Sequence, residues 1–314
     1  MIILVEGADC TGKSTLVERL AKSLIHGYDV EILHAKKPTS ESILWQYLVP
    51  LQSALRERSA LVIDRWHPGE LVYGPSRRGG SRLSPGQFEY VELVMRSIGF
   101  VGVLCDRSDD ELAACLERRG DDEAELTTDQ LQTDAAAFRA VLANRHNWVT
   151  YDPGWVRSPS DEVSVLTDII SRVTPLAPFV RAPVVGAYVG HRRPRALLVG
   201  DRRNPTDQHE PLPWPFVPWT STSGLWMFDS LVANDVPLQE LGVINGCERT
   251  PTELHAAWVA LGHPPTVALG VNAAKALAEA FVPITARTAH PQWWRRFKHR
   301  EGAAFAAVIR EAMR

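Results

Sequence analysis

Short apolar runs alternate with longer amphipathic segments over the first 175 residues. The apolar runs predict five strands, at Ile2–Glu6, Val30–Ala35, Ala60–Asp64, Phe100–Cys105 and Trp148–Tyr151. The amphipathic segments predict helices at Lys13–His26, Glu41–Arg58, Pro85–Ser97, Asp109–Arg119, Thr128–Asn144 and Ser160–Arg172. Because strands and helices alternate, we expect an α/β fold with a parallel sheet that carries helices on both faces.

A proline-rich stretch without periodicity, Thr174–Pro183, interrupts this pattern. We therefore expect a domain over residues 1–175, a linker over 176–184 and a second, smaller α/β domain over 185–314. The strands predicted after the linker are Ala196–Val199, Leu241–Asn245 and Thr266–Leu269. The helices predicted there are Leu225–Asn234, Pro251–Leu261, Ala273–Phe281 and Gly302–Met313. A length of 314 residues also favours two domains over one.

Composition narrows the class of protein. Hydrophobic residues make up 45% and charged residues 23%, which is typical of a soluble globular chain. The apolar run Met1–Val5 is too short for a signal peptide or a membrane span, so we expect no membrane association. Four scattered cysteines argue against a disulfide framework or a cysteine metal site and favour a cytoplasmic location. The net charge of −3 combines an acidic first half with a mildly basic second half.

The segment from Gly7 to Ser14 fits the phosphate-binding pattern G-x-x-x-x-G-K-[ST] in full. It follows a predicted strand and opens a predicted helix, so its backbone N–H groups can converge on phosphate oxygens. We expect Lys13 to contact the β and γ phosphates and Ser14 to bind Mg²⁺. The sequence thus predicts ATP and Mg²⁺ as cofactors, bound by Gly7, Cys10, Thr11, Gly12, Lys13, Ser14 and Thr15. The alternative is a glycine-containing turn of no catalytic consequence.

Two further groups of charged residues belong with this loop. Asp64 ends a predicted buried strand and is expected to bind the metal, and Arg65 next to it can pair with a phosphate. Arg118 and Arg119 precede a glycine and could close over the transferred phosphoryl group. The alternative for these two arginines is a helix end with favourable cations.

These motifs together resemble those of thymidylate kinases, with phage-encoded members the most similar. The resemblance rests on Glu6-Gly7-Ala8-Asp9, Gly12-Lys13-Ser14-Thr15, Asp64-Arg65-Trp66, Tyr73, Arg118, Arg119 and Asp121. It implies that Asp9 contacts the acceptor's sugar hydroxyl, Arg65 its phosphate, and Tyr73 or Trp66 its base. It also implies a homodimer. Two departures fall at the acceptor site, where Gly74 replaces a glutamine and Lys36-Lys37-Pro38-Thr39 stands in place of an Arg-Glu-Pro-Gly motif.

The second half is similar to the uracil-DNA glycosylase superfamily in the order and spacing of four segments. They are Leu198–Pro205, Pro215–Pro218, Val243–Cys247 and Ala289–Pro291. The resemblance implies that Phe216 stacks on a flipped base, Asn245 reads its pairing edge, and His290 lies over the sugar. Because Cys247 is the only cysteine in this half, the iron–sulfur cluster of some members is excluded. We predict a domain that reads a base or DNA rather than an active glycosylase.

The segment Trp293–Arg300 interleaves aromatic residues with cations. This composition suits contacts to single-stranded nucleic acid, with Arg295 and Arg296 on phosphates. The alternative is a helix start whose tryptophans pack into the core.

Three functions are consistent with the sequence. The first is an ATP-dependent kinase of free deoxynucleoside monophosphates. The second is a kinase whose acceptor is a hydroxymethylated pyrimidine base, such as 5-hydroxymethyluracil, in DNA. The third is a nucleotide-responsive DNA-binding protein without an acceptor. The expected partners are therefore a nucleoside triphosphate and either a pyrimidine nucleotide or DNA.

Overall fold

The computed structural model describes residues 1–35, 43–56, 58–119, 126–142, 145, 147–173, 188–201, 214–218 and 223–314. The predicted linker and Lys37 lie outside these residues. The chain divides into two compact units. Unit 1 comprises Met1–Ile43, Pro50–Arg82 and Gly99–Pro175, and unit 2 comprises Leu44–Val49, Leu83–Ile98 and Leu176–Arg314.

Unit 1 is built on a parallel sheet whose strand order is β2-β3-β1-β4-β5. The strands are β1 (Ile2–Glu6), β2 (Asp29–His34), β3 (Ser59–Asp64), β4 (Phe100–Cys105) and β5 (Trp148–Tyr151). Every residue of β1, β3 and β4 is buried, as expected for central strands covered on both faces. The carboxyl ends of β1 and β3 are therefore neighbours, and Val5 pairs with Asp64.

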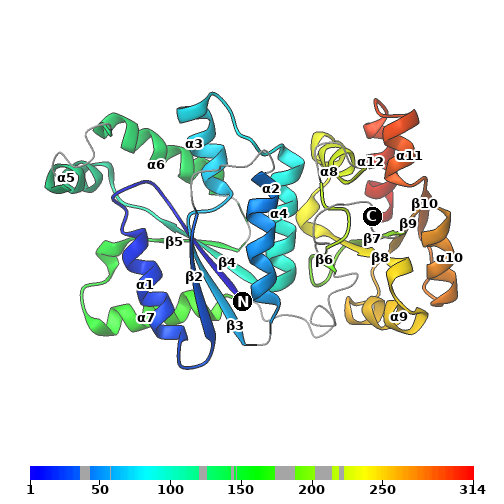
Figure 1. The fold of residues 1–314 in the computed structure, drawn as a ribbon, viewed down its shortest axis with the longest axis horizontal. Helices are drawn as coiled ribbons and strands as arrows, with labels where there is room; N and C mark the ends of the chain where they lie inside the picture. Colours follow the sequence, from blue (N-terminus) through cyan, green and yellow to red (C-terminus); the bar gives the residue numbers. More distant parts are fainter. Residues whose placement is uncertain are drawn as a thin grey trace. The chain divides into compact units, whose positions relative to one another are not determined.

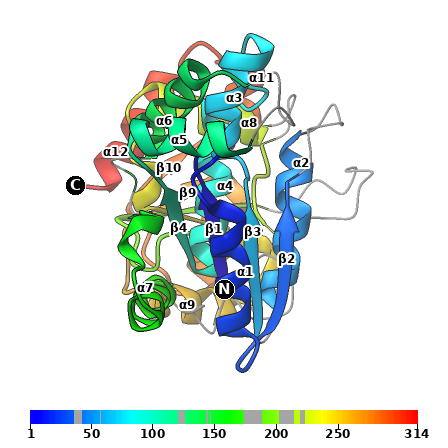
Figure 2. The same cartoon turned by 90° about the vertical axis from the view of Figure 1, so that its left-hand side faces the viewer.

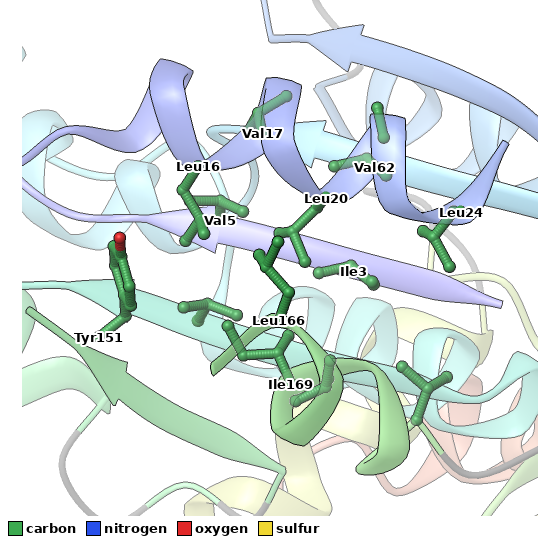
Figure 3. Close-up of a cluster of buried hydrophobic side chains, with 14 of the residues drawn as sticks. Ile3, Val5, Leu16, Val17, Leu20, Leu24, Val62, Tyr151, Leu166 and Ile169 are labelled. Carbon is green, nitrogen blue, oxygen red and sulfur yellow. The ribbon is translucent and has the colours of Figure 1, made fainter. Parts of the chain in front are cut away.

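Helices cover both faces of this sheet. They are α1 (Lys13–Leu24), α3 (Pro68–Arg78), α5 (Asp109–Arg119), α6 (Thr128–Leu142) and α7 (Pro159–Ser171). On one face α1 and α7 pack against alternate residues of the strands, such as Ile3 and Val5 (Figure 3). On the other face α3, α5 and α6 pack around Leu104. Both overall views show α1 and α7 apart from α5 and α6 (Figure 1 and Figure 2). The predicted sheet with helices on both faces is confirmed.

The helices differ from prediction at two places in the first half. The long helix expected at Glu41–Arg58 is a short α2 (Ile43–Leu48) followed by a 3-10 helix, Val49–Leu55. Pro50 explains the change, since it lacks the N–H that an α-helix needs at that position. Helix α3 was not predicted at all, because it contains Pro68, Gly74 and Pro75.

Unit 2 contains a second sheet, with strand order β10-β9-β7-β8-β6. The strands are β6 (Val189–Gly190), β7 (Ala196–Gly200), β8 (Leu241–Asn245), β9 (Thr266–Leu269) and β10 (Ala286–Thr288). Only the pairing of β6 with β8 is antiparallel among the described strands of this sheet. The helices are α4 (Pro85–Ile98), α8 (Ser223–Ala233), α9 (Pro251–Ala260), α10 (Val271–Glu279), α11 (Pro291–Phe297) and α12 (Gly302–Ala312). The α/β class predicted for the second half is confirmed.

Helix α4 groups with unit 2 although its sequence lies between β3 and β4 of unit 1. It contacts α8 and β6. The Tyr90 hydroxyl donates a 2.6 Å hydrogen bond to the Pro215 carbonyl, and the Tyr90 ring lies 4.9 Å from that of Phe228. At the start of α4, Asp229 accepts hydrogen bonds of 2.8 Å from the Ser84 hydroxyl and the Gly86 N–H. Unit 2 is therefore larger than the segment predicted from the linker.

Among the described residues, no helix combines the length and apolar character that crossing a membrane requires.

Candidate functional site

The predicted phosphate loop connects β1 to α1 in unit 1. Gly7 has a φ of +142°, and a Cβ atom there would lie 2.2 Å from the Cys105 carbonyl oxygen. Gly12 has a φ of +88° and caps the N-terminus of α1. Both positions require glycine, the first for space and the second for its left-handed backbone. The loop therefore has the geometry that directs N–H groups and a helix N-terminus at an anion.

Lys13 lies inside this loop. Its side chain is 4% exposed, and its ammonium donates to the Ala8 carbonyl and lies 3.9 Å from the Asp9 carboxylate. Burial lowers the pKa of Lys13, and the nearby Arg65 cation adds to this effect. The Thr11 hydroxyl donates to the same Ala8 carbonyl over 2.8 Å. The Ala8 carbonyl is a neutral partner and only partly compensates the buried charge of Lys13. The phosphates of a bound nucleotide would supply the missing negative charge.

Asp64 and Ser14 form the candidate metal site. The Ser14 hydroxyl lies 3.3 Å from Asp64 Oδ2, and His34 Nδ1 lies 3.1 Å from the same oxygen. The other oxygen, Oδ1, is buried and has no hydrogen-bond partner within the described part of the chain. A carboxylate and a hydroxyl are the oxygen donors that Mg²⁺ prefers, and the orphaned oxygen leaves room for a ligand. The residues present therefore fit a magnesium ion.

Asp9 is surrounded by cations from three elements. It pairs with Arg65, and its carboxylate lies 3.9 Å from both Lys13 and Arg77. Burial alone would raise the pKa of Asp9, but these cations outweigh it and hold the pKa below its usual range. Asp9 is thus an anion within the phosphate loop, and its contact with an acceptor stays a prediction.

Arg77 belongs to the same cluster but was not predicted. Its guanidinium donates a 3.1 Å hydrogen bond to Asp134 on α6 and lies over the Tyr73 ring, 4.3 Å from the centroid. Tyr73 also packs edge-on against Phe138, and its buried hydroxyl has no hydrogen-bond partner within the described residues. Burial raises the pKa of Tyr73, so the hydroxyl stays protonated and can donate. The i, i+4 spacing of Tyr73 and Arg77 could have revealed the pair, had α3 been predicted.

Glu6 and Trp66 lie behind this cluster. The Trp66 backbone N–H donates to Glu6 Oε1 over 2.5 Å. The Trp66 side chain is 5% exposed, so little of the indole is open to a base, whereas Tyr73 is only half-buried. Burial raises the pKa of Glu6 to about 7, against the opposing effects of the Trp66 hydrogen bond and the Lys13 charge.

Arg107 is a second cation that the sequence reasoning missed. It follows β4 directly, and its Nη2 lies 3.9 Å from the position that a Cβ atom on Gly12 would take. Arg139 on α6 fixes this segment by donating to both carboxylate oxygens of Asp106 and, over 2.7 Å, to the Arg107 carbonyl. Because Asp106 is already engaged, the Arg107 guanidinium stands beside the loop as a cation available to a ligand.

The other predicted site residues of unit 1 have fewer described contacts. Cys10 is buried with a φ of +65°, and Thr15 is exposed on the first turn of α1. Arg118 is exposed near the end of α5. The Arg119 side chain, Asp121 and Lys37 fall outside the described part of the structure, so their roles stay predictions.

In unit 2 the predicted base-reading residues lie together at the carboxyl edge of the sheet. A Cβ atom on Gly200, at the end of β7, would lie 2.1 Å from the Phe216 ring and 3.0 Å from Asn245 Oδ1. The rings of Phe216 and His290 have centroids 5.6 Å apart. Phe216, Asn245 and His290 come from three separate segments of the chain and therefore lie close together at this edge of the sheet.

The polar groups of this cluster are partly engaged. Asn245 is buried, and its Nδ2 donates to Glu248 over 3.2 Å. His290 caps α11, and its Nδ1 accepts a 3.2 Å hydrogen bond from the Gln292 N–H. Burial lowers the pKa of His290 despite the opposing Asp201 charge, so the imidazole is neutral at pH 7. These groups can offer a base one aromatic face and neutral hydrogen-bonding edges.

Comparison with known proteins gives similarity in structure only. No protein-family model matches the chain, and no curated protein matches it. The YorR protein from Bacillus subtilis, solved in complex with phosphorylated GDP, is 24% identical with a TM-score of 0.43, covering 55% of this chain and 94% of that protein. Polyphosphate kinase 2 from Arthrobacter aurescens TC1 is 14% identical with a TM-score of 0.39, covering 54% of this chain and 65% of that protein. Both likenesses extend over about half of the chain.

Proposed function

We propose that unit 1 is a P-loop phosphotransferase that moves the γ-phosphoryl group of a magnesium-bound nucleoside triphosphate to an acceptor. The observation that carries the proposal is the loop from Gly7 to Ser14, with the Lys13 ammonium inside it and Asp64 beside the Ser14 hydroxyl. The acceptor oxygen would bond to the γ-phosphorus while the bond to the β–γ bridging oxygen breaks. The nucleoside diphosphate then leaves.

The chain's own residues have distinct parts in this reaction. The loop N–H groups and Lys13 hold the phosphates in line, and Ser14 and Asp64 hold the metal. The metal, when bound, neutralises charge on the β and γ phosphates. Arg107 is placed to add positive charge beside Gly12. The exposed Arg118 is proposed to reach the transferred group from α5.

The acceptor that we propose first is a pyrimidine nucleoside monophosphate, as in thymidylate kinases. Asp9 would accept a hydrogen bond from the sugar, Arg65 would pair with the phosphate, and the Tyr73 ring would contact the base. The cluster of these residues with Arg77 supports this assignment, since it combines one anion, two guanidinium groups and an aromatic ring beside the loop. A homodimer of the thymidylate kinase kind remains a prediction.

A second acceptor is supported by unit 2. The convergence of Phe216, Asn245 and His290 suits a site that stacks on an extruded base and reads its edge. A uracil-DNA glycosylase-like reader joined to a kinase would present a hydroxymethylated pyrimidine in DNA for phosphorylation. Asp9, held as an anion, would orient the hydroxyl of that base through a hydrogen bond, and the hydroxyl proton would pass to solvent.

Transfer of a labelled γ-phosphoryl group distinguishes these possibilities. The protein is incubated with γ-labelled ATP, Mg²⁺ and one of three acceptors: thymidylate, hydroxymethylated deoxyuridylate or DNA containing 5-hydroxymethyluracil. Label in a mononucleotide supports the first acceptor, and label in the polymer supports the second. Label in free phosphate alone would leave a nucleotide-responsive DNA-binding protein.

The catalytic proposal itself is tested with Lys13→Ala. We expect at least a 100-fold loss of transfer and of affinity for magnesium ATP, because the ammonium inside the loop is removed. Lys22→Ala is the matched control, since Lys22 is an exposed lysine on the last turn of the same helix. Equal activity of the two variants would overturn the proposal.

A further inference from the structure

Unit 2 contains a cavity of about 590 Å³ whose lining includes Arg295, one of the two arginines that the sequence predicts on nucleic-acid phosphates. One wall is α8, through residues such as Trp226 and Ser230, and the other is the segment from α11 to α12. Arg295 and Arg300 contribute its cationic side chains, and His299 is part of the same lining. The cavity thus differs in position from the Phe216, Asn245 and His290 cluster. We call it the α8–α11 groove.

The α8–α11 groove is cationic. The Nε atom of Arg295 is buried without a hydrogen-bond partner, and Arg300 is exposed, and neither guanidinium forms an ion pair with any described residue. The neighbouring Lys298 is different, because it pairs with Glu301 over 2.7 Å. Asp229, the acidic residue of the lining, is engaged at the start of α4. Two guanidinium groups without a carboxylate partner among the described residues favour an anionic ligand.

The flank of α11 away from Arg295 is aromatic, because Trp293 and Phe297 are each two residues from Arg295 and so lie about 160° around the helix from it. Trp293 is 42% exposed and Phe297 68% exposed, and their rings lie 5.8 Å apart on successive turns of the helix. Arg296, also exposed, lies between them in sequence. By contrast, Trp294 is held in place by stacking on Trp226 and by a 2.8 Å hydrogen bond to Thr288. Trp293 packs edge-on against Trp294, yet both Trp293 and Phe297 keep a large part of the ring open to a ligand.

We propose that the α8–α11 groove and the exposed face of α11 bind single-stranded DNA. Arg295 and Arg300 would contact phosphodiester oxygens, while Trp293 and Phe297 would stack on bases. A duplex fits this surface less well, because its bases are stacked on one another and offer no ring face to an exposed side chain. The inference rests on the proposed function in its DNA-acceptor form and supplies the contacts that would hold the strand.

The experiment measures the binding of a fluorescent oligothymidylate by anisotropy between 50 and 200 mM salt. We expect the double variant R295E/R300E to bind at least 10-fold more weakly, with a salt slope reduced by about one to two. The matched control is K275E/R314E, which makes the same change of charge at two exposed positions on α10 and at the end of α12. Circular dichroism checks that both variants keep the fold.

A second variant tests the aromatic contacts separately from charge. Phe297→Ala should weaken binding of oligothymidylate about 10-fold, because each stacked base contributes ~1–3 kcal/mol. It should leave binding of inorganic polyphosphate unchanged, since that polymer has no bases. Arginine variants should weaken both.

Three results would overturn the inference. They are equal affinity of R295E/R300E and its control, equal affinity of wild type for single strand and duplex, and tighter binding of an RNA strand of the same length. Magnesium ATP affinity is measured on every variant. A wild type that binds DNA through the groove but has no affinity for ATP would sink the proposed phosphotransferase and leave the groove result standing.

Discussion

The carboxylates of Glu6 and Asp9, at the start of the phosphate loop, have pKa values shifted in opposite directions because their neighbours differ. Asp9 has three cations within 4 Å and stays ionised despite burial. Glu6 is fully buried, and the N–H of Trp66 and the charge of Lys13 do not offset the loss of hydration. Its pKa is therefore raised to about 7. A change of pH near 7 should therefore alter the free energy of unfolding more through Glu6 than through Asp9.

This difference predicts a pH effect of Glu6→Gln. The native state binds the Glu6 proton more tightly than the unfolded chain does, so the stabilisation is present below pH 4.5 and is lost as pH rises to about 7. Glutamine does not ionise, so the variant does not lose stability in this way as pH rises. Relative to wild type, the variant should gain on the order of 3 kcal/mol in unfolding free energy between pH 4.5 and pH 8. Urea unfolding across this range measures the gain.

The control for the pH effect is Glu18→Gln, which changes an exposed glutamate on α1. Its unfolding free energy should follow that of wild type at every pH. A Glu6→Gln curve parallel to wild type would contradict the raised pKa.

Arg77 should act on the acceptor and not on the nucleotide. Its guanidinium lies close to Asp9, Tyr73 and Asp134, the residues proposed to hold the acceptor and the helix beside them. Arg77→Ala should therefore raise the KM of whichever acceptor is active about 10- to 100-fold, with the KM of ATP unchanged within about twofold. Arg77→Lys should recover only part of the loss, because lysine lacks the planar group that stacks on Tyr73. Steady-state kinetics with each substrate varied in turn measures both constants.

Arg19→Ala serves as the control for this variant, because it removes a guanidinium that pairs with Glu162 on the opposite face of the sheet. A rise in both KM values together with a lower melting temperature would indicate that Arg77 is only structural.

The site residues that could be found from sequence are those in continuous motifs. Lys13 and Ser14 are fixed by the loop pattern, and Asp64 by its place at the end of an apolar strand. Arg77 and Arg107 could not be found this way. Their importance depends on which carboxylates are already engaged by other residues, and that is a property of the tertiary structure.

At the scale of elements, the strands were predicted well because central parallel strands are continuous apolar runs. Ile2–Glu6, Phe100–Cys105 and Leu241–Asn245 have the predicted bounds. Helix α3 was missed because two prolines and two glycines hide its periodicity, although Pro68 suits the first turn of a helix. Strands β6 and β10 were missed because they contain only two and three residues.

Gly74 in α3 gives a prediction at this scale. A Cβ atom there would lie 2.9 Å from the Gly80 carbonyl oxygen and the Ser81 Cα, so the chain after the helix can approach only glycine. Gly74→Ala should lower the unfolding free energy by about 1–3 kcal/mol, as overpacking does. Gly80→Ala is the control, since a Cβ atom at Gly80 meets nothing within 4 Å. Thermal unfolding of the two variants measures the difference, and equal melting temperatures would contradict the close approach.

For the whole molecule, the division into compact units does not follow the order of the chain. The linker predicted at 176–184 suggests that everything before it folds with the first sheet. Helix α4 instead supplies Tyr90 to the core of unit 2 and takes its N-terminal cap from Asp229. No local pattern in residues 85–98 shows whether this helix packs with the first sheet or with unit 2, because the apolar face of an amphipathic helix could pack on either. The fold of unit 2 therefore depends on residues from the first half of the sequence.

A fragment comprising residues 185–314 tests this dependence. It lacks α4, so the apolar side chains of α8 that pack on Tyr90, including Phe228, become exposed to water. We expect the fragment to retain helical circular dichroism but to lose its cooperative thermal transition and to bind a hydrophobic dye. In the intact chain Tyr90→Ala should destabilise by about 3–5 kcal/mol, the usual effect of removing a buried ring, whereas Tyr28→Ala at a partly exposed position should have little effect. A fragment that unfolds cooperatively without residues 83–98 would show that α4 only rests on unit 2. A synthetic peptide of residues 83–98 that restores the transition would show that it completes the core.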